Sequence, residues 1–165
     1  MYHPIILGIC TPMNFQYKLT GSIVTYKNNI EILVRTVQSF FNTNIPVFLY
    51  LIDNNSGKKY FRNLYDKLKH FKHVYIHENK SNKGFGYGHN IALKKLIPSE
   101  YHLILNPDIE IHKGTLEKLV TFMEEQHEVA LISPKILNED GSIQYLNKRL
   151  PSVFDLFARR FLPPA

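Results

Sequence analysis

The sequence has little cysteine, and it has no apolar run long enough to cross a membrane. Its single cysteine, Cys10, cannot form a disulfide within the chain, so a reducing compartment such as the cytoplasm is the simpler setting. A membrane-spanning helix needs about 18 to 20 apolar residues, whereas the apolar segment 4–10 is much shorter and follows no basic region typical of a secretory signal. We therefore expect a cytoplasmic protein in which residues 1–20 form a leader or an extra strand.

Several catalytic signatures are also absent. The eight histidines include no HExxH motif and no regular ligand spacing, which together with the single cysteine argues against a structural zinc site. Neither the GxSxG turn of serine hydrolases nor the GxxxxGK(S/T) loop of P-loop proteins occurs. We interpret His89, which precedes Asn90, as an ordinary helix residue rather than a catalytic base.

Composition and charge indicate one globular domain with an anionic partner. With 44% hydrophobic and 21% charged residues, a chain of this length buries about two-thirds of its unfolded surface. The net charge of +6 favours phosphorylated molecules, nucleic acid or anionic lipid. The lysines and arginines are scattered rather than gathered in one run, so solvated helix faces explain most of them. We expect no nucleic-acid partner.

Apolar runs alternate with segments of helical spacing along the chain. This pattern predicts a mainly parallel sheet with helices on both faces, an α/β fold. Strands are expected at residues 21–26, 46–52, 74–77, 101–105 and 129–133, helices at 30–41, 58–69, 90–96 and 116–123, and a hairpin turn at 138–142.

Polar clusters follow three of these strands, at the ends where ligands bind in open parallel sheets. They are Thr25 and Tyr26, residues 53–56 (DNNS), and residues 106–108 (NPD). A fourth cluster, residues 82–90, opens a helix whose free amides could face a phosphate. The coincidence of the clusters is more informative than any one of them.

Each cluster also has a purely structural explanation. Tyr26 could be an aromatic residue at a strand end, and Asp53 could cap the next helix. The GxGxG spacing at 84–88 does not match the dinucleotide motif GxGxxG, and a flexible turn would explain it. NPD could simply end a strand. Alternatively, Asp108 could bind Mg²⁺ or Mn²⁺ together with two phosphates of a nucleotide, because these cations favour carboxylate and phosphate oxygens.

Four motifs in this order resemble those of bacterial family 2 glycosyltransferases, and most closely the branch that includes rhamnosyltransferases of cell-surface polysaccharide synthesis. The motifs are IVTYKNN, LIDNNSGK, NKSNKGFGYGHNIAL and LILNPDIEI, and the resemblance covers roughly residues 22–160. It implies a Rossmann-like GT-A fold, with a nucleotide-sugar-binding domain at 21–150 and the start of an acceptor-side region at 151–165. The implied partners are a nucleotide diphosphate sugar, such as dTDP-rhamnose, and a glycan or lipid-linked acceptor.

The resemblance also implies a role for individual residues. Asp108 matches the metal ligand, for Mg²⁺ or Mn²⁺. The residues that match the family's donor site are Thr25, Tyr26, Asp53, Asn54, Ser56, Asn82, Gly84, Phe85, Gly86, Asn90 and Asn106.

The sequence departs from the family pattern in two ways. Asn106 occupies the first acidic position of the DxD motif, and no residue after 133 matches the acidic general base, so the catalytic residues are unknown. A truncated or degenerate homologue that binds nucleotide without catalysis is the alternative. The last amphipathic segment, residues 154–162, could make a peripheral contact with the inner membrane, although a core helix without its partner would show the same pattern.

Overall fold

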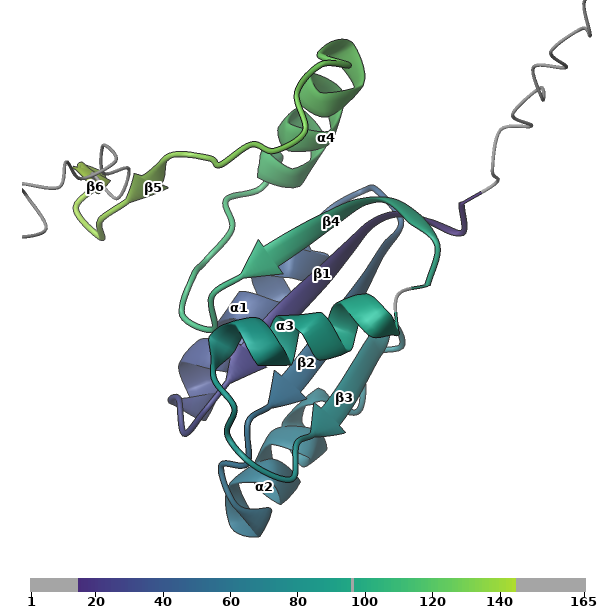
Figure 1. Cartoon of the computed structure of the whole chain (residues 1–165). Helices are drawn as coiled ribbons and strands as arrows, with labels where there is room; N and C mark the ends of the chain where they lie inside the picture. The colour runs from purple at the N-terminus through teal and green to yellow at the C-terminus, as the bar shows by residue number, and fades with distance from the viewer. Residues whose placement is uncertain (1–14, 96, 145–165) are drawn as a thin grey trace, which may run out of the picture. The chain divides into compact units, whose positions relative to one another are not determined.

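The computed structural model describes residues 15–95 and 97–144 of the chain. Helices and strands alternate through most of this part (Figure 1). In chain order the elements are β1 (Tyr17–Thr25), α1 (Ile30–Phe41), β2 (Val47–Asp53), α2 (Lys58–Leu68), β3 (Val74–Glu78), α3 (Phe85–Lys94), β4 (Ser99–Leu105), α4 (Thr115–Glu125), β5 (Ile136–Leu137) and β6 (Ile143–Gln144).

The first four strands form a parallel sheet in the order β3-β2-β1-β4. The chain moves outward from β1 to β3 and then returns, through α3, to the opposite side of β1. Figure 1 shows α3 lying across one face of this sheet and α1 on the other. The expected α/β fold with helices on both faces is confirmed.

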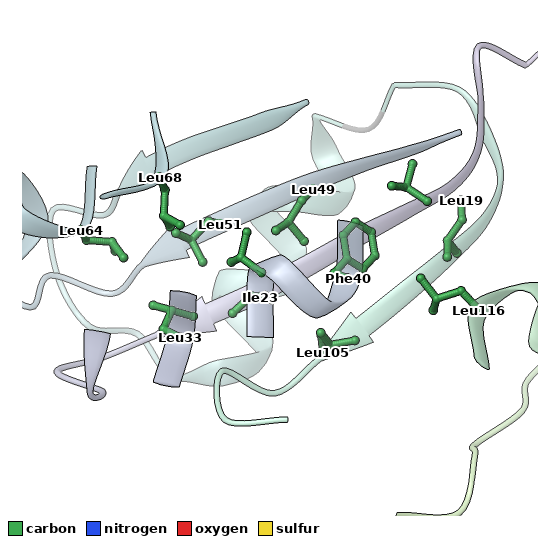
Figure 2. Packing of buried hydrophobic residues seen from close by; sticks show 12 residues of the cluster. Leu19, Ile23, Leu33, Phe40, Leu49, Leu51, Leu64, Leu68, Leu105 and Leu116 are labelled. Carbon is green, nitrogen blue, oxygen red and sulfur yellow. The ribbon is translucent and has the colours of Figure 1, made fainter. Parts of the chain in front are cut away.

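The larger core lies between the sheet and the helices α1 and α2 (Figure 2). Alternate residues of each strand point to this face, because successive side chains of a strand lie on opposite sides. Its fully buried members include Ile23, Leu33, Val37, Phe40, Leu49, Leu51, Leu64 and Leu68. Burying a side chain of this kind contributes roughly 1.5 to 3 kcal/mol, so this face is the main source of stability.

The smaller core lies under α3 and is only partly apolar. Val24, Tyr50, Ile52 and Ala92 are buried there. The phenol of Tyr50 donates a hydrogen bond to the carbonyl oxygen of Lys95 (3.0 Å), which holds the end of α3 to the sheet. The remaining buried positions of β1 on this face are the polar residues Thr20 and Ser22.

Three predicted elements differ from the structure. The first strand begins at Tyr17 rather than residue 21, since the buried Tyr17 and Leu19 extend its pairing. Helix α3 begins at Phe85 rather than residue 90, because packing against the sheet overrides the low helix propensity of Gly86 and Gly88. Residues 129–133 are not a strand, and Leu131 is 88% exposed with no neighbouring strand to pair with in the described part of the chain.

The described residues fall into two units, one ending at His127 and the other beginning at Glu128. The second contains the antiparallel pair β5 and β6, closed by a turn in which Asn138 N–H donates to the carbonyl oxygen of Ser142 (2.8 Å). The predicted hairpin is therefore confirmed, whereas the amphipathic segment 154–162 lies outside the described residues. Among the described helices, none has the length and apolar character needed to span a membrane.

Candidate functional site

The polar clusters predicted from the sequence meet at the carboxyl edge of the parallel sheet. Strand pairing places Thr25 beside Asp53, and Asp53 beside Glu78. On the other side of β1, Leu105 at the end of β4 lies beside Ile23. The strand order reverses between β1 and β4, and in open α/β sheets a ligand crevice forms at such a point.

The turn after β2 is held by the carboxylate of Asp53. Its two oxygens accept hydrogen bonds from the backbone N–H (3.0 Å) and the hydroxyl (2.5 Å) of Ser56. The Ser56 hydroxyl oxygen in turn accepts from the backbone N–H of Lys27 (2.8 Å). Because Asp53 is fully buried, its carboxylate fixes the turn and ties it to the loop after β1.

Asn54 joins three loops at this edge. Its backbone N–H donates to the carbonyl oxygen of Thr25 (2.8 Å), and its side-chain amide donates to the carbonyl oxygen of Gly84 (3.0 Å). The side-chain oxygen of Asn54 accepts from the amide of Asn79 (2.6 Å). Asn54 and Asn79 are both buried, so the loops after β1, β2 and β3 form one hydrogen-bonded unit.

The hydroxyl of Thr25 is also engaged within the protein. It donates to the side-chain oxygen of Asn28 (3.0 Å) and lies 3.1 Å from the phenol of Tyr60. Burial, with a smaller contribution from the negative charge of Asp53, raises the pKa of Tyr60, so this phenol stays protonated and donates to Thr25. The adjacent Tyr26 is 45% exposed, and the ammonium group of Lys27 lies 5.1 Å from the centre of its ring.

The glycine-bearing segment opens α3 at the same edge. Asn82 accepts a hydrogen bond from the backbone N–H of Gly84 (2.9 Å), and Gly84 has a φ of 89°, which favours glycine. No side chain caps the helix, so the first amides of α3 remain available to an acceptor. Phe85, Gly86 and Asn90 are exposed beside them.

The NPD segment after β4 is held by two polar residues of α1. Thr36 donates a hydrogen bond to the carbonyl oxygen of Pro107 (3.1 Å), and the backbone N–H of Ile111 donates to the hydroxyl of Ser39 (3.0 Å). Asn106 and Asp108 are both exposed. The backbone of the segment is therefore fixed while the Asp108 carboxylate faces solvent.

These residues fit a divalent cation that takes most of its ligands from elsewhere. Among the residues described, no three His, Cys, Asp or Glu side chains form a cluster able to hold a metal ion. Mg²⁺ typically uses only one or two protein carboxylates beside phosphate and water oxygens. An exposed Asp108 meets that need, and the exposed amide oxygen of Asn106 is a second oxygen donor on the same segment.

A buried polar network lies under α3, away from the exposed edge. The hydroxyl of Ser22 is 2.8 Å from His89 Nδ1 and 2.8 Å from His102 Nε2. The other nitrogen of His102 is 2.9 Å from the hydroxyl of Thr20, which is also within 2.9 Å of the Ser99 hydroxyl. The network thus alternates hydroxyls and imidazoles across β1, β4 and α3.

The network ends at a nitrogen without a partner. His89 Nε2 is buried and makes no hydrogen bond, and a buried unsatisfied polar atom costs about 1 to 3 kcal/mol. Burial, and then the neighbouring His102, lower the pKa of His89 to about 4. Burial likewise lowers the pKa of His102. Both imidazoles are consequently neutral at pH 7.

Sequence reasoning placed polar segments at this edge but missed the side chains that hold them. Asp53 bonds to Ser56 within the turn, but it does not cap the next helix, because the N-cap of α2 is Gly57 and no side chain bonds there. Asn54 is buried between loops. The supporting residues not anticipated are Asn28, Thr36, Ser39, Tyr60 and Asn79. Thr36 and Ser39 carried a usable signal, because polar residues three apart lie near the buried face of an amphipathic helix.

A family model for "Glycosyl transferase family 2" matches residues 22–163 of the chain. The chain belongs to this family. The hexosyltransferase Agl10 of low-salt glycan biosynthesis in Haloferax volcanii is 28% identical over 122 residues, covering 72% of this chain and 36% of Agl10. The family 2 membership expected from the four motifs is confirmed, and the chain spans about a third of the length of this curated relative.

Solved structures share the fold of this glycosyltransferase chain. A structure of residues 1–349 of TarS from S. aureus has a TM-score of 0.57 at 20% identity, covering 74% of this chain and 40% of that one. The mannosyltransferase PcManGT from Pyrobaculum calidifontis, in complex with GDP-Man and Mn²⁺, has a TM-score of 0.55 at 16% identity, covering 67% and 33%. This likeness confirms the Rossmann-like GT-A architecture.

Proposed function

We propose that the whole protein transfers a sugar from a nucleotide diphosphate sugar to an acceptor hydroxyl, and that the described residues hold the donor. The observation that carries the proposal is the arrangement at the carboxyl edge: an exposed Asp108 follows β4, and the uncapped amides of α3 open at the same edge. A carboxylate that can bind a cation and amides that can bind an anion together suit a metal-bound diphosphate.

Different loops of this edge would contact different parts of the donor. Tyr26 offers an exposed ring to the base, while Thr25, Asp53, Asn54 and Ser56 shape the loops around the base and ribose. The segment that includes Asn82, Gly84, Phe85, Gly86 and Asn90 would line the donor pocket, with Asn106 beside the metal ligand Asp108. The internal hydrogen bonds of Asp53 and Asn54 indicate that these two act mainly by fixing loop positions.

In the transfer, the acceptor oxygen forms a bond to the anomeric carbon as the bond from that carbon to the diphosphate oxygen breaks. A divalent cation on Asp108 would supply charge stabilisation for the departing nucleoside diphosphate. A carboxylate must take the proton from the acceptor hydroxyl. We assign this base to no described residue, so it would come from another part of the whole protein.

The donor class is supported by what related folds bind. TarS has been solved with UDP-GlcNAc and PcManGT with GDP-Man and Mn²⁺, and both ligands are nucleotide diphosphate sugars. A rhamnose donor such as dTDP-rhamnose, and a glycan or lipid-linked acceptor of the cell envelope, follow from the resemblance of the four motifs to the bacterial rhamnosyltransferase branch. A cytoplasmic location with peripheral contact at the inner membrane suits such an acceptor.

The competing proposal is a protein that binds nucleotide but performs no transfer. It is favoured by one observation: Asp140, in the turn between β5 and β6, accepts hydrogen bonds from Ser142 and is a poor candidate for the base. Incubation of the whole protein with a radiolabelled donor and cell-envelope lipids separates the two proposals. Transfer of label to lipid favours the enzyme, and nucleotide binding without transfer favours the alternative.

Titration calorimetry with UDP, GDP and dTDP, with and without Mn²⁺, tests the donor site itself. We expect at least one nucleotide to bind more tightly with Mn²⁺, and Asp108→Asn to abolish the effect of the metal. Asp66→Asn on the exposed side of α2 removes the same charge and should leave binding unchanged. If no nucleotide binds, or if Asp108→Asn retains the metal effect, the proposed donor site is wrong.

A further inference from the structure

We infer that His89 is a positioning residue that sets the place of the α3 amino terminus, and with it the donor-binding segment, through its hydrogen bond to Ser22. The inference rests on the proposed function. His89 is buried under α3, away from the exposed edge, and its role is supported by the contacts between α3 and the sheet.

Three contacts hold the first turns of α3. The carbonyl oxygen of Gly84 accepts from Asn54, and His89 Nδ1 lies 2.8 Å from the hydroxyl of Ser22. Between them, Gly88 packs so closely on β1 that a Cβ atom there would lie 2.7 Å from the methyl groups of Val24. Phe85, Gly86 and Tyr87 make up the exposed outer side of this turn. The contacts with the sheet therefore set the direction of the free amides at the start of α3.

The hydrogen bond between His89 and Ser22 forms with either tautomer of His89. The Thr20 hydroxyl has one proton and lies 2.9 Å from both Ser99 and His102, so the donors and acceptors of the network can run in either direction. If His89 Nδ1 carries the proton it donates to Ser22, and if it does not it accepts from Ser22. In both cases the bond joins α3 to β1, and His89 Nε2 is left without a partner.

Stability alone does not explain this network. The equivalent positions on the opposite face of the sheet are filled by leucine, isoleucine and phenylalanine, and an apolar residue under α3 would leave no unsatisfied nitrogen. An apolar contact lets a helix slide, whereas the bond from His89 to Ser22 is directional and fixes one rotation and height of α3 on β1. A polar residue that leaves a buried nitrogen unsatisfied is expected where geometry matters more than stability.

Two substitutions of His89 separate its two nitrogens. The amide of His89→Asn reaches the position of Nδ1 and can keep the bond to Ser22, whereas the amide of His89→Gln reaches the position of Nε2 and loses it. Ser22→Ala removes the same bond from the strand side. As a matched control, His73→Gln alters a histidine at the opposite edge of the sheet, where it bonds to Tyr17.

The experiment measures, on the full chain with Mn²⁺, the dissociation constant of whichever of UDP, GDP and dTDP the wild type binds best. Thermal unfolding is measured in parallel. We expect His89→Gln and Ser22→Ala to weaken binding roughly five- to tenfold, and His89→Asn and His73→Gln to bind within about twofold of the wild type.

The outcomes of this experiment test the positioning role of His89 separately from the proposed function. If His89→Gln binds as the wild type does, if His89→Asn binds no better than His89→Gln, or if the affinities simply follow the melting temperatures, the positioning role is wrong. Those results would leave the donor site itself standing. If the wild type binds none of the nucleotides, the proposed function and this inference are both overturned.

Discussion

On one face of the sheet α1 and α2 bury an almost wholly apolar core, whereas on the other face α3 covers two hydroxyls and two imidazoles beside a smaller apolar cluster. The two faces share the same strands, so alternate residues of β1 serve different purposes. Ile23 is part of the large core, and its neighbour Ser22 hydrogen-bonds across to α3 and β4.

The two faces contribute differently: the apolar core mainly stabilises the sheet, and the hydrogen bonds under α3 mainly position that helix. Burial of apolar area is roughly additive and has no preferred direction, so it stabilises the sheet without defining where a helix terminus points. Hydrogen bonds under α3 contribute less net free energy and define geometry more strictly. Helix α3, which contributes to the proposed donor pocket, is thus held by directional contacts.

Truncating the large core should give the greatest loss of stability. Phe40→Ala removes a fully buried ring and is expected to lower the free energy of unfolding by about 3 to 5 kcal/mol. Urea unfolding followed by circular dichroism measures this loss. Ile23→Val, a milder change in the same core, should cost about 0.5 to 1.5 kcal/mol. A loss below about 1 kcal/mol for Phe40→Ala would contradict the assignment of stability to this face.

Crowding the face under α3 should give the next largest effect. Gly88→Ala places a methyl group 2.7 Å from Val24, and overpacking of this kind costs about 1 to 3 kcal/mol. Val24→Ala should relieve the clash, so the double variant is expected to be less destabilised than the sum of the two single variants. Chemical unfolding of all three variants gives the coupling. Simple additivity would show that α3 shifts freely on β1.

Of the two faces of the sheet, the one under α3 should be the more sensitive to acid. The pKa of His89 is about 4 in the folded protein and 6.5 ordinarily, so the unfolded chain binds more protons between these values. The contribution of neutral His89 to the free energy of unfolding is constant above pH 6.5. It falls as the pH is lowered toward 4, by on the order of 2 kcal/mol. Unfolding by urea across this range measures the slope. His89→Asn should flatten it, apart from the part due to His102, and an unchanged slope would contradict the buried neutral imidazole.

The strands and the polar segments at their ends could be predicted because their signals are local. Residues 101–105 are an apolar run that stops at a polar segment, and this places Asp108 at a strand end without knowledge of the fold. The network under α3 could not be predicted in this way. Ser22 lies 67 residues from His89 and 80 from His102 along the chain, and a hydroxyl within a β-branched run gives no periodic signal of its partners.

The start of α3 was missed for a related reason. Three glycines at 84, 86 and 88 predict a turn by propensity, yet the structure has a helix from Phe85 because Gly88 permits the approach to Val24. Gly86 has no such explanation, since a Cβ atom at that position would meet nothing within 4 Å. Its lack of a side chain is required by no neighbour in the described structure.

Gly86→Ala should give the smallest change in stability and should reveal whether a ligand approaches α3. Alanine in place of a helical glycine is expected to raise the free energy of unfolding by about 0.5 to 1 kcal/mol. If the donor lies against the backbone here, the added methyl group should nevertheless weaken nucleotide binding measured by calorimetry. Asn63→Ala on the exposed side of α2 serves as the control, because it also improves helix propensity and should leave binding unchanged. If Gly86→Ala raises stability but weakens nucleotide binding, while Asn63→Ala leaves binding unchanged, the ligand lies over this turn. Unchanged affinity in Gly86→Ala would instead remove Gly86 from the proposed pocket.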